Sequence, residues 1–451
     1  MPIAGLLRLA PRLRDIVSAA AREQMSLRDN TGVRSCARSR RGAPIPWLFD
    51  HRRPRDSLMQ QQDSIDWKKI LVPVFGPSLL YGLSNGAILP VIALTARDLG
   101  ASVAMAGLIA ALIGIGSLFG NIPASLIADR FGERRALAGA ALLSVMGLLL
   151  VVTVPHLWGL VIAMLMQGVA QSIFQLARQS YLIETVPKAF RARALSTLAG
   201  TTRIGAFLGP FAGAALIFLM GLDGAYWVAI AAMCGAGIIA VAAPDIEKAT
   251  APARGHGRIG VAQVARSHQG VYATLGVGVM LISALRTSRQ VVIPLWASHL
   301  GMDAATASLV YGLVAAVDMS VFYPAGKVMD RYGRLWIAMP CTLLMGGSLM
   351  AIPFTQGTTS FVLVALILGF GNGIGSGIVM TLGADAAPPN ARNQFLGIWR
   401  LISDLGACGG PVMLSSLTAV ASLGAAAFGV GLLGIVAAGV FARWLPGSTP
   451  S

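Results

Sequence analysis

The fold of this chain is decided by the stretch Pro123-Ala124-Ser125-Leu126-Ile127-Ala128-Asp129-Arg130-Phe131-Gly132-Glu133-Arg134-Arg135, which comes directly after a long apolar run. A second copy, Pro324-Ala325-Gly326-Lys327-Val328-Met329-Asp330-Arg331-Tyr332-Gly333-Arg334, follows 201 residues later (330 minus 129). Both copies place Asp-Arg-aromatic-Gly six residues after a proline. The same offset pairs Gly100 with Gly301, Gly168 with Gly369, Pro187 with Pro388, Arg191 with Arg392, and Gly209-Pro210 with Gly410-Pro411. A repeat of this length predicts two structurally similar halves.

The repeated stretch has the chemistry of a tight loop at a membrane surface. Asp129 and Asp330 end apolar helices, where a carboxylate opposes the helix dipole and needs an outside partner. Gly132 and Gly333 allow the chain to reverse. The basic residues Arg130, Arg134, Arg331 and Arg334 then mark the cytoplasmic side. A plain turn with orienting charges explains either copy alone equally well, whereas two copies in register favour a functional loop.

With these motifs, the chain resembles the major facilitator superfamily over roughly residues 68–444. The family's loop signature is Gly-x-Leu-x-Asp-Arg-x-Gly-Arg-Arg, and here Ser125, Ile127 and Glu133 replace three of its residues. The second copy keeps Gly326 but has Val328 at the leucine position. The resemblance implies that the loop latches the two halves together, with Asp129 facing the start of helix 11 and Asp330 the start of helix 5.

Composition independently indicates a membrane protein. Hydrophobic residues make up 55% of the chain and charged residues only 12%, with a mean hydropathy of +0.70. One aqueous core cannot hide that much apolar surface, so the bilayer is the expected solvent. The net charge of +16 does not lie on a soluble domain, so nucleic-acid binding is not expected. The cysteines and histidines show no metal-binding spacing, so no metal or cofactor is expected.

Twelve apolar runs are long enough to span a bilayer, which predicts an all-α membrane protein with two pseudo-symmetric six-helix halves. The runs are roughly 70–92, 103–127, 136–154, 158–182, 195–219, 225–243, 270–296, 304–328, 336–354, 360–384, 395–420 and 423–443. We expect the halves at 59–243 and 270–451, joined by a cytoplasmic linker at 244–269. Loop arginines and lysines gather on one side, which predicts cytoplasmic termini and a bacterial inner membrane location.

Residues 1–58 differ from the rest, because they are polar, arginine-rich and without a spanning run. A basic amphipathic helix at a membrane surface is one interpretation, from Leu6 to Ala21. A transit peptide is a second, although Asp15, Glu23 and Asp29 argue against it. We favour a third, in which translation starts at Met59 and the arm is not native.

Helix 5 carries Gly205, Gly209, Pro210 and Gly213, whose spacing makes a smooth groove for close helix packing. The pattern resembles the helix-5 signature Gly-x-x-x-Gly-Pro-x-x-Gly-Gly, which in the family is associated with exporters that exchange substrate for protons. Generic close packing is the alternative. Nothing in the sequence fits the G-x-x-x-x-G-K-[ST] loop of a nucleotide site, so an ion gradient or facilitation is expected to drive transport.

Charged residues inside spans are costly and usually functional. Three charged residues are expected near the midplane of the bilayer: Arg203 in the run 195–219, Asp318 in the run 304–328 and Asp404 in the run 395–420. We hypothesise that Asp318 is a protonatable carboxylate that responds to the proximity of Arg203, the alternative being a permanent structural ion pair. Asp404 is the weaker candidate, because Arg400 lies four residues earlier and can satisfy it.

Other polar residues in the spans are candidates for the substrate cavity: Asn85, Gln171, Gln175, Arg178, Arg286, Arg289 and Asn372. The arginines can equally snorkel to headgroups, and the amides can join helices. The cavity helices look sparse in the carboxamides and aromatic rings that usually hold sugars.

We therefore expect a secondary transporter, not an enzyme, that exports small amphipathic compounds in exchange for protons, as in multidrug efflux. The alternatives are a proton symporter or facilitator importing a sugar-like or organic-acid nutrient, and a non-transporting membrane sensor. The expected partners are a small-molecule substrate, protons and lipid, without nucleic acid, and the chain is expected to act as a monomer.

Overall fold

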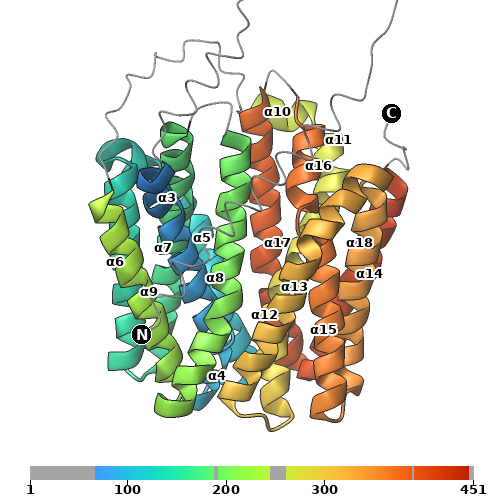
Figure 1. Cartoon of the computed structure of the whole chain (residues 1–451). Helices are drawn as coiled ribbons and strands as arrows, with labels where there is room; N and C mark the ends of the chain where they lie inside the picture. Colours follow the sequence, from blue (N-terminus) through green and yellow to red (C-terminus); the bar gives the residue numbers. More distant parts are fainter. Residues whose placement is uncertain (1–66, 187–190, 244–260, 389–390, 446–451) are drawn as a thin grey trace, which may run out of the picture. The chain divides into compact units, whose positions relative to one another are not determined.

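The computed structural model describes residues 67–186, 191–243, 261–388 and 391–445, and the expected arm at 1–58 lies outside these ranges. The described residues form helices and turns without a β-strand (Figure 1). The first group of helices comprises α3 (Trp67–Ile88), α4 (Ile92–Asp98), α5 (Val103–Phe131), α6 (Glu133–Thr153), α7 (Leu157–Thr185), α8 (Arg191–Met220) and α9 (Asp223–Ala242).

The second group begins with the short helices α10 (Val261–Ser267) and α11 (Gln269–Val271) and one π-helical turn, η2 (Tyr272–Gly276). The long helices of this group are α12 (Val277–His299), α13 (Ala304–Tyr332), α14 (Leu335–Ala351), α15 (Thr358–Gly375), α17 (Arg392–Val420) and α18 (Leu423–Trp444). A 3₁₀ turn, η3 (Ile352–Phe354), follows α14, and α16 (Ile378–Ala386) continues α15 after a break at Ser376 and Gly377.

Eleven spans in the described part of the chain are long and apolar enough to cross a membrane. Two of them are interrupted: α3 with α4 forms one span, and α15 with α16 forms another. The run expected at 395–420 forms the 29-residue helix α17 but is not among the eleven. Asp404 and the serines and glycines of α17 lower its hydropathy, although its length is ample for a span.

The turns confirm the repeat in the sequence. Gly132 and Gly333 end α5 and α13 with φ of 82° and 96°, a conformation that favours glycine. Gly100 and Gly301 also match, with φ of 87° and 78°. The helices that follow these two glycines begin with a side-chain cap in each half, Ser102 on α5 and Asp303 on α13.

Glycine packing also repeats at the offset of 201 residues. Gly205 and Gly209 place the backbone of α8 directly against that of α3, and a Cβ at either position would collide with α3 backbone atoms. Gly406 and Gly410 do the same between α17 and α12. Gly213 lies beside Ala87, so three glycines of α8 form the contact with α3. Small residues at these positions allow the close helix approach that stabilises association in lipid.

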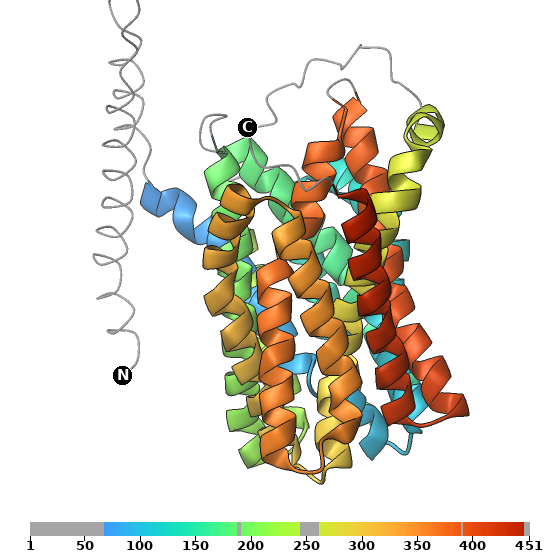
Figure 2. The same cartoon turned by 90° about the vertical axis from the view of Figure 1, so that its right-hand side faces the viewer.

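The two groups of helices meet along two lines of contact. Helix α5 packs against α17, and α8 packs against α13, while most other helix contacts stay within one group. Figure 2 shows α13, α14, α15 and α18 of the second group toward the viewer, with the first group behind. A membrane transporter site between two helix groups would therefore be walled by α5, α8, α13 and α17 together with the helices beside them.

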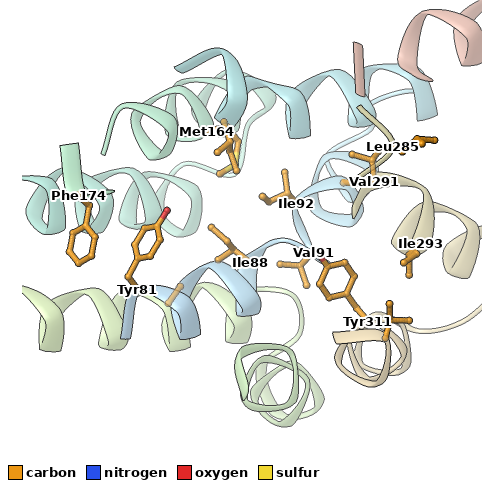
Figure 3. Close-up of a cluster of buried hydrophobic side chains, with 14 of the residues drawn as sticks. Tyr81, Ile88, Val91, Ile92, Met164, Phe174, Leu285, Val291, Ile293 and Tyr311 are labelled. Carbon is orange, nitrogen blue, oxygen red and sulfur yellow. The ribbon is translucent and has the colours of Figure 1, made fainter. Parts of the chain in front are cut away.

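A buried apolar cluster lies between the groups at the end that carries Gly100 and Gly301. Figure 3 shows Val91 and Ile92, at the start of α4, near Val291 and Ile293 of α12 and Tyr311 of α13. Each of these five residues is at most 7% exposed. They are called the apolar layer below.

Candidate functional site

A cavity of about 340 Å³ lies between the two groups of helices. Its walls come from α3, α4, α5, α7, α8, α12 and α17, so both groups contribute. The lining includes Asn85, Gln171, Gln175 and Asp404, four of the residues singled out in the sequence. Ile92 and Val291 of the apolar layer bound the same cavity. The cavity therefore has a mainly apolar lining that carries several polar groups and one acidic side chain.

Asp404 is held loosely by residues from both groups. Its Oδ2 accepts a hydrogen bond from Asn121 Nδ2 of α5 at 3.4 Å and lies 3.9 Å from Arg400 Nε. Arg400 donates to Gln175 Oε1 of α7 at 2.8 Å. The expected pairing of Asp404 with Arg400 is thus present but long, and about a third of the Asp404 side chain is exposed. A carboxylate in this position is accessible to protons from the cavity.

Four carboxamide side chains line the cavity. Besides Asn85, Gln171 and Gln175 it is lined by Gln290 and by the ring of Tyr81. Spacing along the chain does not reveal this, because the residues come from α3, α7 and α12 and meet only in the folded protein. Three of the four, Asn85, Gln171 and Gln175, were candidates from the sequence.

Arg178 borders the cavity rather than extending to the headgroups. Its Nη1 donates to Thr202 Oγ1 at 2.7 Å, and its guanidinium lies 5.5 Å from the centre of the Tyr81 ring. Tyr81 stacks on Phe174 with ring centres 4.8 Å apart. A cation over an aromatic face is stabilised by the ring quadrupole, so Arg178 fixes one wall of the cavity.

Asp318 of α13 lies in a second polar cluster. Its Oδ2 accepts from Asn372 Nδ2 of α15 at 2.6 Å and from Arg289 Nη2 of α12 at 3.2 Å. The side chains of Arg289 and Asp318 are 11% and 17% exposed, so the ion pair is largely shielded from solvent. Arg289 and Asn372, both substrate-cavity candidates from the sequence, therefore hold a carboxylate. Asn372 joins two helices, which was the alternative interpretation of its amide.

In this conformation the ion pair of Asp318 is with Arg289 and not with Arg203. Arg203 of α8 donates from Nη1 to Ser376 Oγ at 2.9 Å, and its guanidinium lies 4.2 Å from the centre of the Phe322 ring. The direction of each side chain around its helix axis decides which partner it meets.

Arg286 turns to the break between α15 and α16. Its Nη2 donates to the backbone carbonyl of Gly375, the last residue of α15. Cations stabilise a helix C-terminus, where carbonyl groups lack partners in the helix. Arg286 and Arg289 therefore make contacts inside the second helix group, so the alternative in which they snorkel to outer headgroups is not what the structure shows.

The repeated loops occupy the end of the bundle opposite the apolar layer. Asp330 and Arg331 are exposed, and Arg334 Nε forms an ion pair with Asp385 Oδ2 at 2.9 Å. Arg134 donates to the carbonyl of Val241, which ties the first loop to the end of α9. Arg130 lies over the ring of Phe131. The Asp129 side chain and much of the expected partner region of Asp330, including 187–190, lie outside the described parts.

Asn121, Ser376, Phe322 and Asp385 are contacts that the sequence reasoning missed. Asn121 had a signal, since it is a polar residue within an apolar run. Ser376 lies in a glycine-rich stretch whose break was not foreseen.

A larger hollow of about 780 Å³, lined by Arg97, Trp296 and His299 among others, lies at the end with Gly100 and Gly301. Among the described residues no group of acidic, histidine or cysteine side chains fits a metal ion.

Comparison with known proteins agrees with this architecture. The sequence profile described as Major Facilitator Superfamily matches residues 75–411. The chain therefore belongs to the Major Facilitator Superfamily and is a multi-pass membrane transporter, not an enzyme. It is 26% identical over 399 residues to the uncharacterized MFS-type transporter YddS of Bacillus subtilis, an alignment that covers 82% of this chain and 90% of that protein.

Two further proteins that resemble this chain differ from each other in their function. The multidrug resistance protein MdtG of Enterobacter lignolyticus is 27% identical over 157 residues, which is 34% of this chain and 38% of that protein. The crystal structure of a D-xylose-proton symporter superimposes with a TM-score of 0.66 at 19% identity, covering 85% of this chain and 99% of that one. The structural likeness extends to the whole fold, while the sequence likeness to MdtG is partial.

Proposed function

We propose that this protein exports small amphipathic compounds in exchange for protons, and that Asp404 carries the proton. The observation that carries the proposal is the position of Asp404 in the wall of the cavity between the helix groups. Its contacts to Asn121 and Arg400 are long, so its charge is only partly compensated. A carboxylate that is both accessible and weakly paired can gain and lose a proton during transport.

The contact between Asp404 and Asn121 joins α17 to α5, and therefore one helix group to the other. A neutral, protonated Asp404 attracts the Asn121 amide less strongly than the carboxylate does, because charge-assisted hydrogen bonds are the stronger ones. Protonation thus weakens one link between the groups, and deprotonation restores it. This gives a physical connection between proton binding and movement of the groups.

Export rather than import is supported by two features. Gly205, Gly209, Pro210 and Gly213 form the close contact of α8 with α3, in the pattern that the family's exporters carry. The partial similarity to the multidrug resistance protein MdtG points the same way.

We further propose that the end with Gly132 and Gly333 and both termini are cytoplasmic, because the basic loop residues gather there. In the same proposal the chain is a monomer of two six-helix halves, 59–243 and 270–451, joined by a linker at 244–269.

The test uses purified protein in sealed vesicles with an imposed proton gradient and a pH-sensitive dye. Hydrophobic cations, neutral drugs and amphipathic acids are added in turn to the native protein, Asp404→Asn and Asp318→Asn. We expect compound-dependent proton movement that disappears in Asp404→Asn, while exchange of labelled compound across the membrane continues. Proton movement that survives in Asp404→Asn but stops in Asp318→Asn would assign the proton to Asp318 instead.

A second candidate is import of a polar nutrient by proton symport. The observation that favours it is the set of carboxamides around the cavity, from Asn85, Gln171, Gln175 and Gln290, beside the Tyr81 ring. The two functions differ in the direction of coupled flow. An inward proton gradient drives accumulation of labelled xylose or glucose in the vesicles under symport. An outward proton gradient drives it under proton exchange, and neither gradient does so under facilitation.

A further inference from the structure

Three arginines gather around the break between α15 and α16, with one carboxylate among them. Arg203 comes from α8, Arg286 and Arg289 come from α12, and Asp318 comes from α13. The carboxylate and the other two guanidiniums are near enough to Arg203 to interact with it electrostatically. Asp318 forms its ion pair with Arg289. Within the described part of this cluster, two positive charges therefore remain without an acidic partner.

Two of the guanidiniums converge on consecutive residues. Arg286 donates to the carbonyl of Gly375, and Arg203 donates to the hydroxyl of Ser376. The C-terminus of α15 offers Arg286 a partial negative charge, equivalent to roughly half of one elementary charge for a full helix. The hydroxyl of Ser376 and the ring of Phe322 are neutral partners for Arg203. The local partners thus offset only part of the excess positive charge.

The cluster also contains polar atoms that lack partners. Within the described structure, the Nε groups of Arg286 and Arg289 are buried without a hydrogen-bond acceptor. Asp318 Oδ1 and Asn372 Oδ1 are buried without a donor. An unsatisfied buried polar group is destabilising, more so when it is charged. A bound ligand with acceptor oxygens would accept hydrogen bonds from the arginine Nε groups. If the ligand carries a proton or a bound water, it would also donate to Asp318 Oδ1 and Asn372 Oδ1.

The cluster adjoins the transport cavity through α12. Thr287 and Gln290 line the cavity, and they lie next to Arg286 and Arg289 along the same helix. The three arginines are not part of the cavity lining, but each is only part-buried. The proposed site therefore lies beside the cavity, where a ligand would place one end at the arginines and its remainder near Val291 and the other apolar lining.

We propose that the Arg203, Arg286 and Arg289 cluster binds the carboxylate of an amphipathic organic acid, the substrate class of this transporter. This inference rests on the proposed transport function and names the chemical group that the site selects. The guanidinium fork matches the geometry of a carboxylate, and its hydrogen bonds to a charged acceptor are stronger than those to a neutral one. A neutral amide of the same shape lacks that charge, so it binds the cluster more weakly.

The experiment compares acids with their primary amides, which have nearly the same shape. Binding of 3-phenylpropanoate, hexanoate and 1-naphthoate and of their amides is measured by calorimetry on the purified full chain. We expect at least one acid to bind about tenfold more tightly than its amide, equivalent to about 1.4 kcal/mol. In Arg286→Gln and in Arg203→Gln the ratio falls toward one, while amide binding persists and shows that the variant is folded.

Arg97→Gln is the matched control, because Arg97 also donates to a backbone carbonyl, that of Ala101, but lies in the other hollow. The acid-over-amide ratio should be unchanged in this variant. A ratio near one for all three pairs in the native protein, or a ratio that persists in both cluster variants, overturns the inference. The proposed function fails separately, through proton movement that is insensitive to Asp404→Asn, so the two failures are distinguishable.

Discussion

Asn372 donates its Nδ2 hydrogen to Oδ2 of Asp318 across 2.6 Å, and this bond joins α15 to α13. Arg289 of α12 donates to the same oxygen at 3.2 Å. One carboxylate oxygen thus holds three helices of the second group together. The pair lies where backbones are already close, because a Cβ on Gly373 would meet the backbone of Asp318. Loss of the Asp318 charge would therefore weaken hydrogen bonds that hold three closely packed helices together.

Replacement of Asp318 should destabilise the protein. Asp318→Asn leaves the shielded guanidinium of Arg289 without an anionic partner, which typically lowers the free energy of unfolding by about 3 kcal/mol. Thermal unfolding in detergent measures the loss. The matched control is Asp385→Asn, because the Arg334–Asp385 pair is 32% and 48% exposed and should contribute less than about 1 kcal/mol. Equal losses in the two variants would contradict the structural importance of the shielded pair.

Glycine positions on α8 should differ sharply in their tolerance of alanine. A Cβ at Gly209 would lie 2.5 Å from the Leu83 carbonyl oxygen and 2.6 Å from the Ala87 nitrogen, both of which are backbone atoms that cannot rotate away. Gly209→Ala should therefore lower the free energy of unfolding by about 1–3 kcal/mol and impair transport.

Gly200→Ala is the control on the same helix, since no neighbouring atom lies within 4 Å of its Cβ position. Alanine has the higher helix propensity, so this change should be neutral or stabilising by up to about 1 kcal/mol. Thermal unfolding and vesicle transport are measured for both variants. A similar penalty at both positions would show that the close α3–α8 contact is not what constrains Gly209.

The two repeated helix caps should respond differently to acid. Thr306 donates from its hydroxyl at 2.6 Å and from its backbone nitrogen at 3.0 Å to the Asp303 carboxylate. These hydrogen bonds hold the pKa of Asp303 below its usual value. A carboxylate whose pKa is lowered on folding stabilises the protein above its unfolded pKa of about 3.9, and this contribution disappears as the pH falls through the folded pKa.

Asp303→Ala should therefore cost roughly 1 kcal/mol at pH 7 and less at pH 3. Ser102 occupies the equivalent position in the first half and accepts from Met105 N at 3.2 Å. Its hydroxyl does not titrate in this range, so Ser102→Ala should cost the same at both pH values. Melting temperatures of the two variants, each relative to native protein at the same pH, check the difference. A penalty at Asp303 that does not change with pH would contradict the assignment.

Thiol labelling should distinguish the cavity from the helix interior. Cys408 lines the cavity and is 8% exposed, whereas Cys341 is fully buried. In a chain with Cys36→Ser and Cys234→Ser, a small thiol reagent should modify Cys408 at a measurable rate and leave Cys341 intact until the protein unfolds. A bound cavity ligand should slow the modification of Cys408. Mass spectrometry of the labelled peptides gives both rates, and faster modification of Cys341 would contradict the position of the cavity.

The sequence predicted the fold because its signals are one-dimensional. Apolar runs report spans, and the offset of 201 residues correctly paired Gly132 with Gly333 and Gly100 with Gly301, glycines that the structure shows in the same conformation. Asp404 could likewise be placed in a span. Its contact with Arg400 followed from the spacing of four residues along one helix.

The partners of Asp318 could not be predicted in the same way. Depth along a helix follows from counting residues, but the direction of a side chain around the helix axis depends on how the helices rotate against one another. Arg203 was the partner considered from the sequence, and only the packing of α12 against α13 and α15 brings Arg289 to Asp318. The break after Gly375 was also missed, because glycine-rich sequence is common in membrane helices that remain continuous.

The apolar layer has a consequence for the energy supply of the cell. Val91, Ile92, Val291 and Ile293 present hydrocarbon, and Tyr311 presents mainly its ring, so these side chains give water no chain of hydrogen-bonding sites to follow. We expect a proton in the cavity to find no hydrogen-bonded path across these side chains. Proton leakage through the purified protein in vesicles should therefore stay at the background level of the bilayer in this conformation.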